Sequence, residues 1–388
     1  MSSGPALAVA SRAPADPDGR SPDLRADLDA VLGPVPPDAD GRAVWRALGT
    51  GGLLDRLYAP GRPGHRIDPD ALATTLSTLD AARPPGVTLS VLVQASTAVP
   101  LLAEFAAGSP PATEALERVL SGAATVALAA TDAGAGSDLT ALATTVESGA
   151  DGVLTVSGTK RWITGATRAD HLLVLARQRP GRHFTCFSWV LVPAGAPGVT
   201  VTAADTDLFG GSGVGHVELD RVRLPGARLL GRTGLGLPLF ARRMATERLA
   251  GALWAVALCR RVIADTRARL LRRHVADAPL WHSDAVRQRL ARCLTEVVKL
   301  DALCRVLGPA AVDSDGAAGA LLKAAVGPTV EVVLAECAQL QGADGFAVGG
   351  AQRLRAEAAV FGIGGGTTEV VLGVVADHVD AILQRIDR

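Results

Sequence analysis

The chain has 388 residues, of which 48% are hydrophobic and 20% charged, and its 39 basic and 39 acidic side chains give no net charge. This length exceeds what one ordinary core organises, so we expect two or three structural units. A balanced charge provides no basic face and argues against a nucleic-acid partner. The five cysteines show no C-x-x-C spacing, which argues against a metal site or a disulfide framework and fits a reducing cytoplasm.

The first 122 residues divide into a leader and a helical region. Residues 1–22 are rich in Ser, Pro, Gly and Asp and lack the pattern of a secretory signal, so we predict a disordered leader. Apolar residues recur at helical spacing over 23–32, 43–57, 69–80 and 87–107, which predicts an N-terminal helical domain over residues 23–122. No uncharged apolar run reaches the roughly 18 residues that a membrane helix needs, so we expect no membrane partner.

The remaining chain has the pattern of a β domain followed by helices. In residues 123–232, short β-type runs lie at 125–130, 143–148, 153–156, 171–176, 184–192, 199–203 and 215–219. Asp151 and Gly152 separate the second and third runs and predict a hairpin turn. Residues 233–388 return to helical spacing over 237–271, 285–307, 317–341 and 368–386. This order predicts an α+β fold with a central sandwich or barrel, rather than alternating βαβ units.

Three segments have the composition of ligand-contacting turns or strands. Residues 131–138 form a glycine-rich turn after a β run, where Thr131 and Ser137 offer hydroxyls, although a plain surface loop is the alternative. Trp162 beside Thr164 can stack on an aromatic ring and bond its edge, but an ordinary sheet tryptophan is the alternative. Residues 362–367 are dense in glycine, and the helical region before them excludes a Rossmann loop. What remains is a turn whose N–H groups can face an anion or a carbonyl oxygen.

The most informative position is Glu247. Helical spacing places this carboxylate on an otherwise apolar stripe, which consists of Phe240, Met244, Glu247, Gly251, Trp254 and Leu258. A buried carboxylate is costly unless it is paired or functional, and burial raises its pKa toward neutrality, as suits a general base. The alternative is an ion pair with Arg243, Arg248 or another helix.

Several ordered segments together resemble the acyl-CoA dehydrogenase family. The turn after Ala130 is similar to that family's TE-x-x-AGSDL signature, and residues 158–164 are similar to its G-x-K-x-W-I-T segment. Residues 339–345 look like its Q-x-x-G-G-x-G turn, and residues 366–369 look like its C-terminal G-T-x-E element. The resemblance covers about residues 130–377 and is weaker over the first 120.

The resemblance implies an N-terminal helical domain, a central β domain and a C-terminal four-helix bundle. It also implies FAD at a subunit interface of a homodimer or homotetramer. Arg273 would grip the FAD pyrophosphate of a neighbouring subunit, and Gln339 and Gly342 would meet the adenosine end. The full set of cofactor-binding residues implied is Thr131, Gly136, Ser137, Trp162, Thr164, Arg273, Gln339, Gly342 and Thr367.

The resemblance offers two positions for the catalytic base. Many family members carry a glutamate directly before the C-terminal Gly-Thr, where this chain has Gly365. Isovaleryl- and long-chain-type enzymes carry it in an E-R-L element of the first bundle helix, which residues 247–249 match. We therefore predict Glu247 as the base and the backbone N–H of Gly365 as a donor to the substrate carbonyl. Glu369 is the alternative base, although its place in a first helical turn is better explained by the helix dipole.

The activity that the resemblance implies is α,β-dehydrogenation of an acyl thioester on coenzyme A or on an acyl carrier protein. Glu247 would take the α-proton and the flavin the β-hydride, with an electron-transfer flavoprotein or oxygen as the final acceptor. A flavin monooxygenase on the same fold is one alternative. A non-catalytic member is another, because motif positions such as Ala343 depart from the family pattern.

Overall fold

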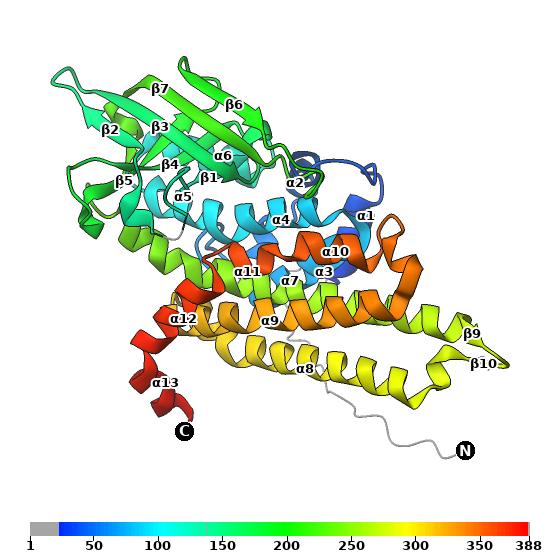
Figure 1. The fold of residues 1–388 in the computed structure, drawn as a ribbon. Coiled ribbons are helices and arrows are strands. Elements are labelled where there is room, and N and C mark those ends of the chain that lie inside the picture. Colours follow the sequence, from blue (N-terminus) through cyan, green and yellow to red (C-terminus); the bar gives the residue numbers. More distant parts are fainter. Residues whose placement is uncertain (1–22, 137, 387–388) are drawn as a thin grey trace.

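The structure is a computed structural model that describes residues 23–136 and 138–386 (Figure 1). The predicted leader at residues 1–22 and the candidate flavin residue Ser137 lie outside this part. All five cysteines are buried free thiols. Among the described residues, no group of three or more His, Cys, Asp or Glu side chains gathers as a metal site.

The N-terminal region is a set of helices: α1 (Leu24–Leu32), α2 (Gly41–Thr50), α3 (Pro69–Ala82), α4 (Pro85–Val93), α5 (Val99–Ala106) and α6 (Pro110–Leu120). Four of them, α1, α2, α3 and α6, begin at a side-chain cap. A π-helical turn, η2 (Gln94–Ala98), joins α4 to α5 within one continuous helical segment. Asp68 caps α3 by accepting from the N–H of Asp70 and Ala71, and Pro69 takes the first helical position.

Two expectations for this region need correction. The helix expected over 43–57 ends at Thr50, because Gly51 and Gly52 follow and Gly52 has a φ of +70°. Residues 55–57 form a separate 3₁₀ turn, η1 (Asp55–Leu57). Helix α6 was not expected, although Ser109 caps it and prolines open it, which is a recognisable start signal.

The central region is a sheet of two halves around an apolar core. Its strands are β1 (Val126–Ala129), β2 (Thr145–Ser148), β3 (Val153–Ile163), β4 (His171–Arg177), β5 (Phe187–Pro193), β6 (Val199–Ala203), β7 (Gly215–Pro225) and β8 (Leu229–Leu230). The order is β6-β7-β3-β2-β4-β5-β8, with β1 parallel to β4. A single residue pair, Thr145 with Arg177, links β2 to β4. Residues of both halves share one core, so the domain is sandwich-like, as expected.

Side chains along β4 and β5 alternate between the core of the sheet and the core that the helices form. Leu172 and Val174 face the sheet core, whereas Leu173 and Leu175 between them belong to the core that the helices form. The predicted hairpin at Asp151 and Gly152 connects the antiparallel strands β2 and β3.

The C-terminal region is built on three long helices that lie side by side (Figure 1). They are α7 (Gly236–Arg272), α8 (Asp284–Val312) and α9 (Gly316–Gln341). The short helices α10 (Ala351–Ala358), α11 (Val360–Ile363) and α12 (Thr368–Asp377) pack on α9, and α13 (Val379–Ile386) follows. The single helix expected over 368–386 is therefore wrong, because the chain breaks at His378 between α12 and α13.

Three described helical segments are long and apolar enough to cross a membrane by length and composition: Pro85–Ala106, Gly316–Phe346 and Ala351–Asp377. Their most apolar 18-residue stretches are 83%, 56% and 17% buried in the protein, respectively. The first segment is thus a core helix, whereas the third leaves most of its apolar stretch uncovered by this chain.

Candidate active site

Helix α7 carries the apolar stripe that the sequence predicts. Met244, Trp254 and Leu258 are buried, and Phe240 meets the ring of Trp189 on β5 edge-on, with centroids 5.7 Å apart. The helix packs against α3, α8 and α9, so this stripe faces the interior of the molecule. Glu247 occupies the middle of the stripe and places a carboxylate among these side chains.

The carboxylate of Glu247 is held by a hydroxyl from the opposite wall. Thr97 Oγ1 donates a hydrogen bond of 2.5 Å to Oε2. Oε1 lies 3.7 Å from the point where a Cβ on Gly365 would stand. Burial raises the pKa of Glu247, and the opposing effects of the Thr97 hydrogen bond and of the nearby charges of Arg248 and Lys323 do not overcome it. The raised pKa makes this carboxylate a stronger general base than an exposed one.

The two cations near Glu247 bind backbone carbonyls in the turn that contains Gly365 and in the helix α11 just before it. Arg248 Nε donates to Gly365 O at 3.1 Å, and Lys323 Nζ donates to Phe361 O. Burial, assisted by the charge of Arg248, lowers the pKa of Lys323 to about 8. These bonds fix the turn against α7 and α9 while both cations stay close enough to favour the ionised form of Glu247.

The alternatives for Glu247 and for the base find no support. Arg243 forms its salt bridge with Glu104, and Glu247 forms no salt bridge with any residue that the structure describes. Glu369 is exposed in the first turn of α12, where Thr367 caps the helix through its hydroxyl. The helix-dipole explanation for Glu369 therefore suffices.

Gly365 has a conformation that leaves its N–H available. Its φ of +75° lies in the left-handed region that favours glycine. Within the described chain, no acceptor is found for this N–H, whereas the N–H of the preceding Gly364 bonds Val360 O. A free backbone donor thus stands next to the Glu247 carboxylate.

On the sheet side, Trp162 projects outward at an irregularity of β3. The pairing of β3 with β7 shifts register between Lys160 and Ile163, and Trp162 between them has a φ of +56°. Its side chain is 58% exposed and meets the ring of His216 edge-on at 5.4 Å. A bulky residue in this backbone region is uncommon and concentrates at ligand sites. The strand therefore presents an exposed indole ring at this irregularity.

The turn next to Trp162 is tied to the sheet by a buried ion pair. Lys160 Nζ lies 2.6 Å from Asp132 Oδ1, and both side chains are almost fully buried. Thr131 O accepts from the N–H of Arg161 at 3.0 Å. A Cβ added to Gly136 would meet nothing within 4 Å, so the turn borders open space. The structure thus brings Thr131 and Gly136 beside the strand that carries Trp162.

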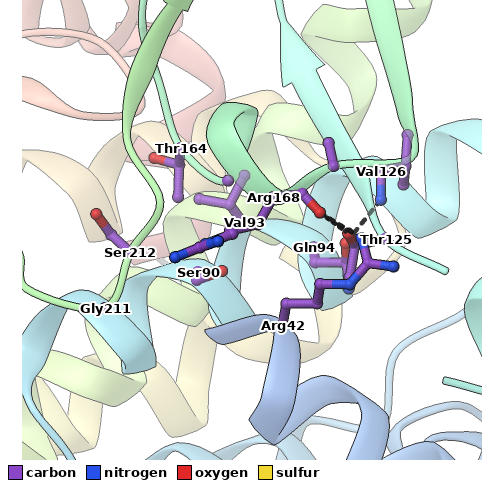
Figure 2. A pocket seen from close by; sticks show the side chains of 12 residues that line it. Arg42, Ser90, Val93, Gln94, Thr125, Val126, Thr164, Arg168, Gly211 and Ser212 are labelled. Carbon is purple, nitrogen blue, oxygen red and sulfur yellow. Dashed lines mark hydrogen bonds between the residues drawn. The ribbon is translucent and has the colours of Figure 1, made fainter. Parts of the chain in front are cut away.

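Thr164 lines a small polar pocket between the sheet and the N-terminal helices. Figure 2 shows Thr164 and Ser212 on one side of it and Arg42, Gln94 and Thr125 on the other. Arg42 is engaged with Asp170, at 2.7 Å, so its charge is already balanced. The residues that line this pocket do not include Glu247 or Gly365.

A second cluster of predicted cofactor residues lies at the far end of α7. The guanidinium of exposed Arg273 is 3.1 Å from the point where a Cβ on Gly342 would stand, and Gln339 is exposed nearby on α9. In the described part of the chain, no carboxylate pairs with Arg273. Arg273 stands about seven turns beyond Glu247, or about 40 Å along the helix axis. One chain therefore contains two separate groups of candidate cofactor contacts.

Sequence reasoning missed two side chains of this site. Thr97 has no motif, and its contact with Glu247 joins residues 150 positions apart. Lys323 lies in an apolar helical run and is 4% exposed. Its single charge within that run is the one signal that marks it as unusual.

Comparison with known proteins places this arrangement in a family. Residues 127–222 match the family model of the acyl-CoA dehydrogenase middle domain, and residues 234–379 match that of the acyl-CoA dehydrogenase C-terminal domain. The acyl-[acyl-carrier-protein] dehydrogenase MbtN of Mycobacterium sp. (strain MCS) is 30% identical over 346 residues, covering 86% of this chain and 85% of its own length.

Solved structures share the fold at lower identity. Butyryl-CoA dehydrogenase from Megasphaera elsdenii superposes with a TM-score of 0.83 at 20% identity, over 93% of this chain and 99% of its own. A glutaryl-CoA dehydrogenase from Mycobacterium smegmatis in complex with FADH2 gives 0.81 at 21%, over 92% and 93%. With matched models over its middle and C-terminal regions and a relative aligned over most of its length, the chain belongs to the acyl-CoA dehydrogenase family.

Proposed function

We propose that this protein is an FAD-dependent dehydrogenase that introduces an α,β double bond into an acyl thioester. The observation that carries the proposal is the position of Glu247, whose Oε1 faces Gly365 while Oε2 is held by Thr97. Relatives named as acyl-carrier-protein and acyl-CoA dehydrogenases support the same activity.

The residues on the sheet side fit a bound flavin. Trp162 offers an exposed indole face, and the neighbouring turn is open at Gly136. Thr131 and Thr164 add hydroxyls for the edge of a planar ring. Arg273 supplies an unbalanced cation for the FAD pyrophosphate. When bound, FAD supplies the acceptor for the hydride that leaves the substrate β-carbon.

The residues of the chain carry the proton transfer. Glu247 Oε1 takes a proton from the α-carbon. The β-carbon loses a hydride, so one C–H bond breaks at each carbon and one C=C bond forms between them. Negative charge develops on the thioester carbonyl oxygen as the proton leaves, and the free N–H of Gly365 is placed to donate to it. Thr97 keeps its hydrogen bond to Oε2 throughout, because a neutral carboxyl still accepts there.

The proposal includes a homodimer, or a dimer within a tetramer, in which each site takes residues from both subunits. A single FAD molecule is much shorter than the roughly 40 Å between Glu247 and Arg273 of one chain. Arg273 and Gly342 therefore serve the FAD of the partner subunit. Apolar side chains left exposed on the last two helices agree with contact between copies: Val370, Leu372, Val379 and Leu383.

The thioester carrier and the electron acceptor are proposed on less specific evidence, namely the names of relatives. The relative aligned over 85% of its own length is named for an acyl carrier protein, whereas others are named for coenzyme A. Both carriers belong to the proposal, as do an electron-transfer flavoprotein or oxygen as acceptor and a cytoplasmic location.

The deciding experiment is anaerobic flavin reduction by paired panels of acyl-CoA and acyl-carrier-protein thioesters. We expect purified protein to be yellow and to bleach with at least one acyl thioester, yielding the α,β-unsaturated product. Bleaching confined to one panel assigns the carrier. A protein that binds FAD but that no acyl thioester bleaches would refute the proposed activity.

A further inference from the structure

Thr97 donates its hydroxyl to a side chain of another helix, unlike the α-helical threonines whose hydroxyls form a hydrogen bond within the described chain. In helices, a buried threonine normally donates to the carbonyl four residues earlier. Five helical threonines do so among the described residues, at 2.7–3.2 Å: Thr74, Thr78, Thr113, Thr266 and Thr295. Thr97 is fully buried, and it donates to Glu247 instead of to its own helix.

Thr97 lies in the π-helical turn η2, where the neighbouring Ser96 still donates to its own helix, to Leu92 O at 2.7 Å. An extra residue in such a turn rotates the following side chains and frees a carbonyl, and these turns are frequent at functional sites. Tyr58 Oη donates to Ala95 O at 2.9 Å, so the backbone of the turn is anchored from η1. Gln94 Oε1 accepts from the N–H of Val126 at 2.9 Å, which anchors the turn to β1 as well. The turn that carries Thr97 is thus held from two sides.

We propose that Thr97 is a positioning residue that holds Oε2 of Glu247, so that Oε1 alone faces the substrate position beside Gly365. This inference rests on the proposed function, but the geometry that carries it belongs to the chain itself. Among the described residues, Oε1 has no hydrogen-bond partner, whereas Oε2 has the 2.5 Å bond from Thr97. A carboxylate with one oxygen tied and one free presents a single, oriented basic atom to the α-carbon.

The same bond acts on the protonation of Glu247. The groups that act on this carboxylate are Thr97 from η2, Arg248 from α7 and Lys323 from α9. A hydroxyl that donates to the ionised form favours it, so removing the hydroxyl raises the pKa of Glu247 further. Hydrogen bonds to charged groups have strengths that correspond to about one to two pH units.

The test compares Thr97→Val, which removes the hydroxyl at nearly constant shape, with Thr97→Ser, which retains it. Thr78→Val is the matched control, because Thr78 is a buried helical threonine that bonds its own helix. Infrared difference spectroscopy follows the protonated-carboxyl band of Glu247, identified by its loss in Glu247→Gln, during a pH titration without substrate. Stopped-flow flavin reduction gives the acidic limb of the rate profile in parallel.

We expect Thr97→Val to move the infrared midpoint and the acidic limb upward by about one to two pH units, whereas Thr97→Ser and Thr78→Val stay at the wild-type midpoint. An unchanged midpoint in Thr97→Val, or an equal shift in Thr97→Ser, would overturn the inference. Thr97→Ala replaces the valine variant if the latter does not fold. The infrared titration needs no turnover, so a failure of the proposed dehydrogenation leaves this test decisive.

Discussion

Oε1 of Glu247 on α7 lies 3.7 Å from the point where a Cβ on Gly365 would stand, although Gly365 lies in the turn before α12, 118 positions along the chain. A carboxylate delivered from α7 therefore occupies nearly the same space as one that a side chain at position 365 would deliver. This explains in spatial terms why the family resemblance offers two positions for one base. Because residue 365 is a glycine, the Glu247 carboxylate can occupy the space beside it.

Glu247→Gln keeps the size of the side chain but removes the base. We expect it to bind FAD as wild type does and to slow flavin reduction by at least about 100-fold, the lower scale for a general base. Stopped-flow absorbance under anaerobic conditions measures the rate. Glu369→Gln is the control, since Glu369 is exposed on α12, and its rate should stay within about twofold of wild type. Wild-type reduction by Glu247→Gln would remove Glu247 from the role.

Moving the carboxylate tests the spatial equivalence directly. A Cβ at Gly365 meets Met244 Cε at 3.6 Å and Arg248 Cγ at 3.8 Å, which are ordinary contacts, so a Cβ fits at this position. The φ of +75° costs a non-glycine residue about 1–2 kcal/mol. We expect the double variant Glu247→Gly, Gly365→Glu to reduce its flavin at least about 10-fold faster than Glu247→Gly alone. Equal rates would show that position 365 does not reach the α-carbon.

The stripe on α7 was predictable because helical periodicity is a local signal. Spacing alone placed Glu247 among Met244 and Trp254, and the structure buries both neighbours. The hairpin at Asp151 and Gly152 was predictable for the same reason, since its turn residues are adjacent. The breaks within helices were not, because a π turn at Gln94–Ala98 and the interruption at His378 leave no strong residue signature.

The partners of Glu247 were beyond sequence reasoning because they come from distant elements. Thr97 reaches it from η2 and Lys323 lies near it from α9, and neither contact has a fixed spacing. The role of Lys160 was hidden in a similar way. It stands inside a recognisable motif, yet its pairing with Asp132 becomes visible only when β3 and the preceding turn are placed together.

Stability should depend on pH through Glu247. Burial raises the pKa of this carboxyl in the folded state above its ordinary value of 4.5. The folded state therefore favours the proton, so the stabilising contribution of the group is complete below pH 4.5 and is lost as pH rises through the raised value. Above that value the wild type carries a partly buried charge that Glu247→Gln lacks.

The measurable consequence is a difference in melting temperature between Glu247→Gln and wild type. We expect the variant to melt higher at pH 8, by a few °C, and the difference to shrink as pH is lowered toward 5. Scanning calorimetry on both proteins across this range provides the comparison. Glu369→Gln again serves as the control and should show no such trend. A difference that grows on acidification would mean that burial does not dominate at this site.

The distance between Glu247 and Arg273 predicts that each active site takes residues from two subunits. If each site combines Glu247 of one subunit with Arg273 of its partner, a hybrid of Glu247→Gln and Arg273→Ala chains contains one site with both lesions and one intact site. Each parent variant has no intact site. Hybrids purified through two different affinity tags should therefore show about half of the wild-type activity per dimer.

The amount of FAD that each dimer retains gives a second test of the shared site. Arg273→Ala removes a cation that no described carboxylate balances, so its homodimer should lose FAD on gel filtration, while the hybrid should retain about one FAD per dimer. If both contacts belonged to the same chain, every site in the hybrid would carry one lesion, and its activity would be as low as that of the parents. Activity in the hybrid thus requires that α7 of each subunit contributes to two different sites, one at each end.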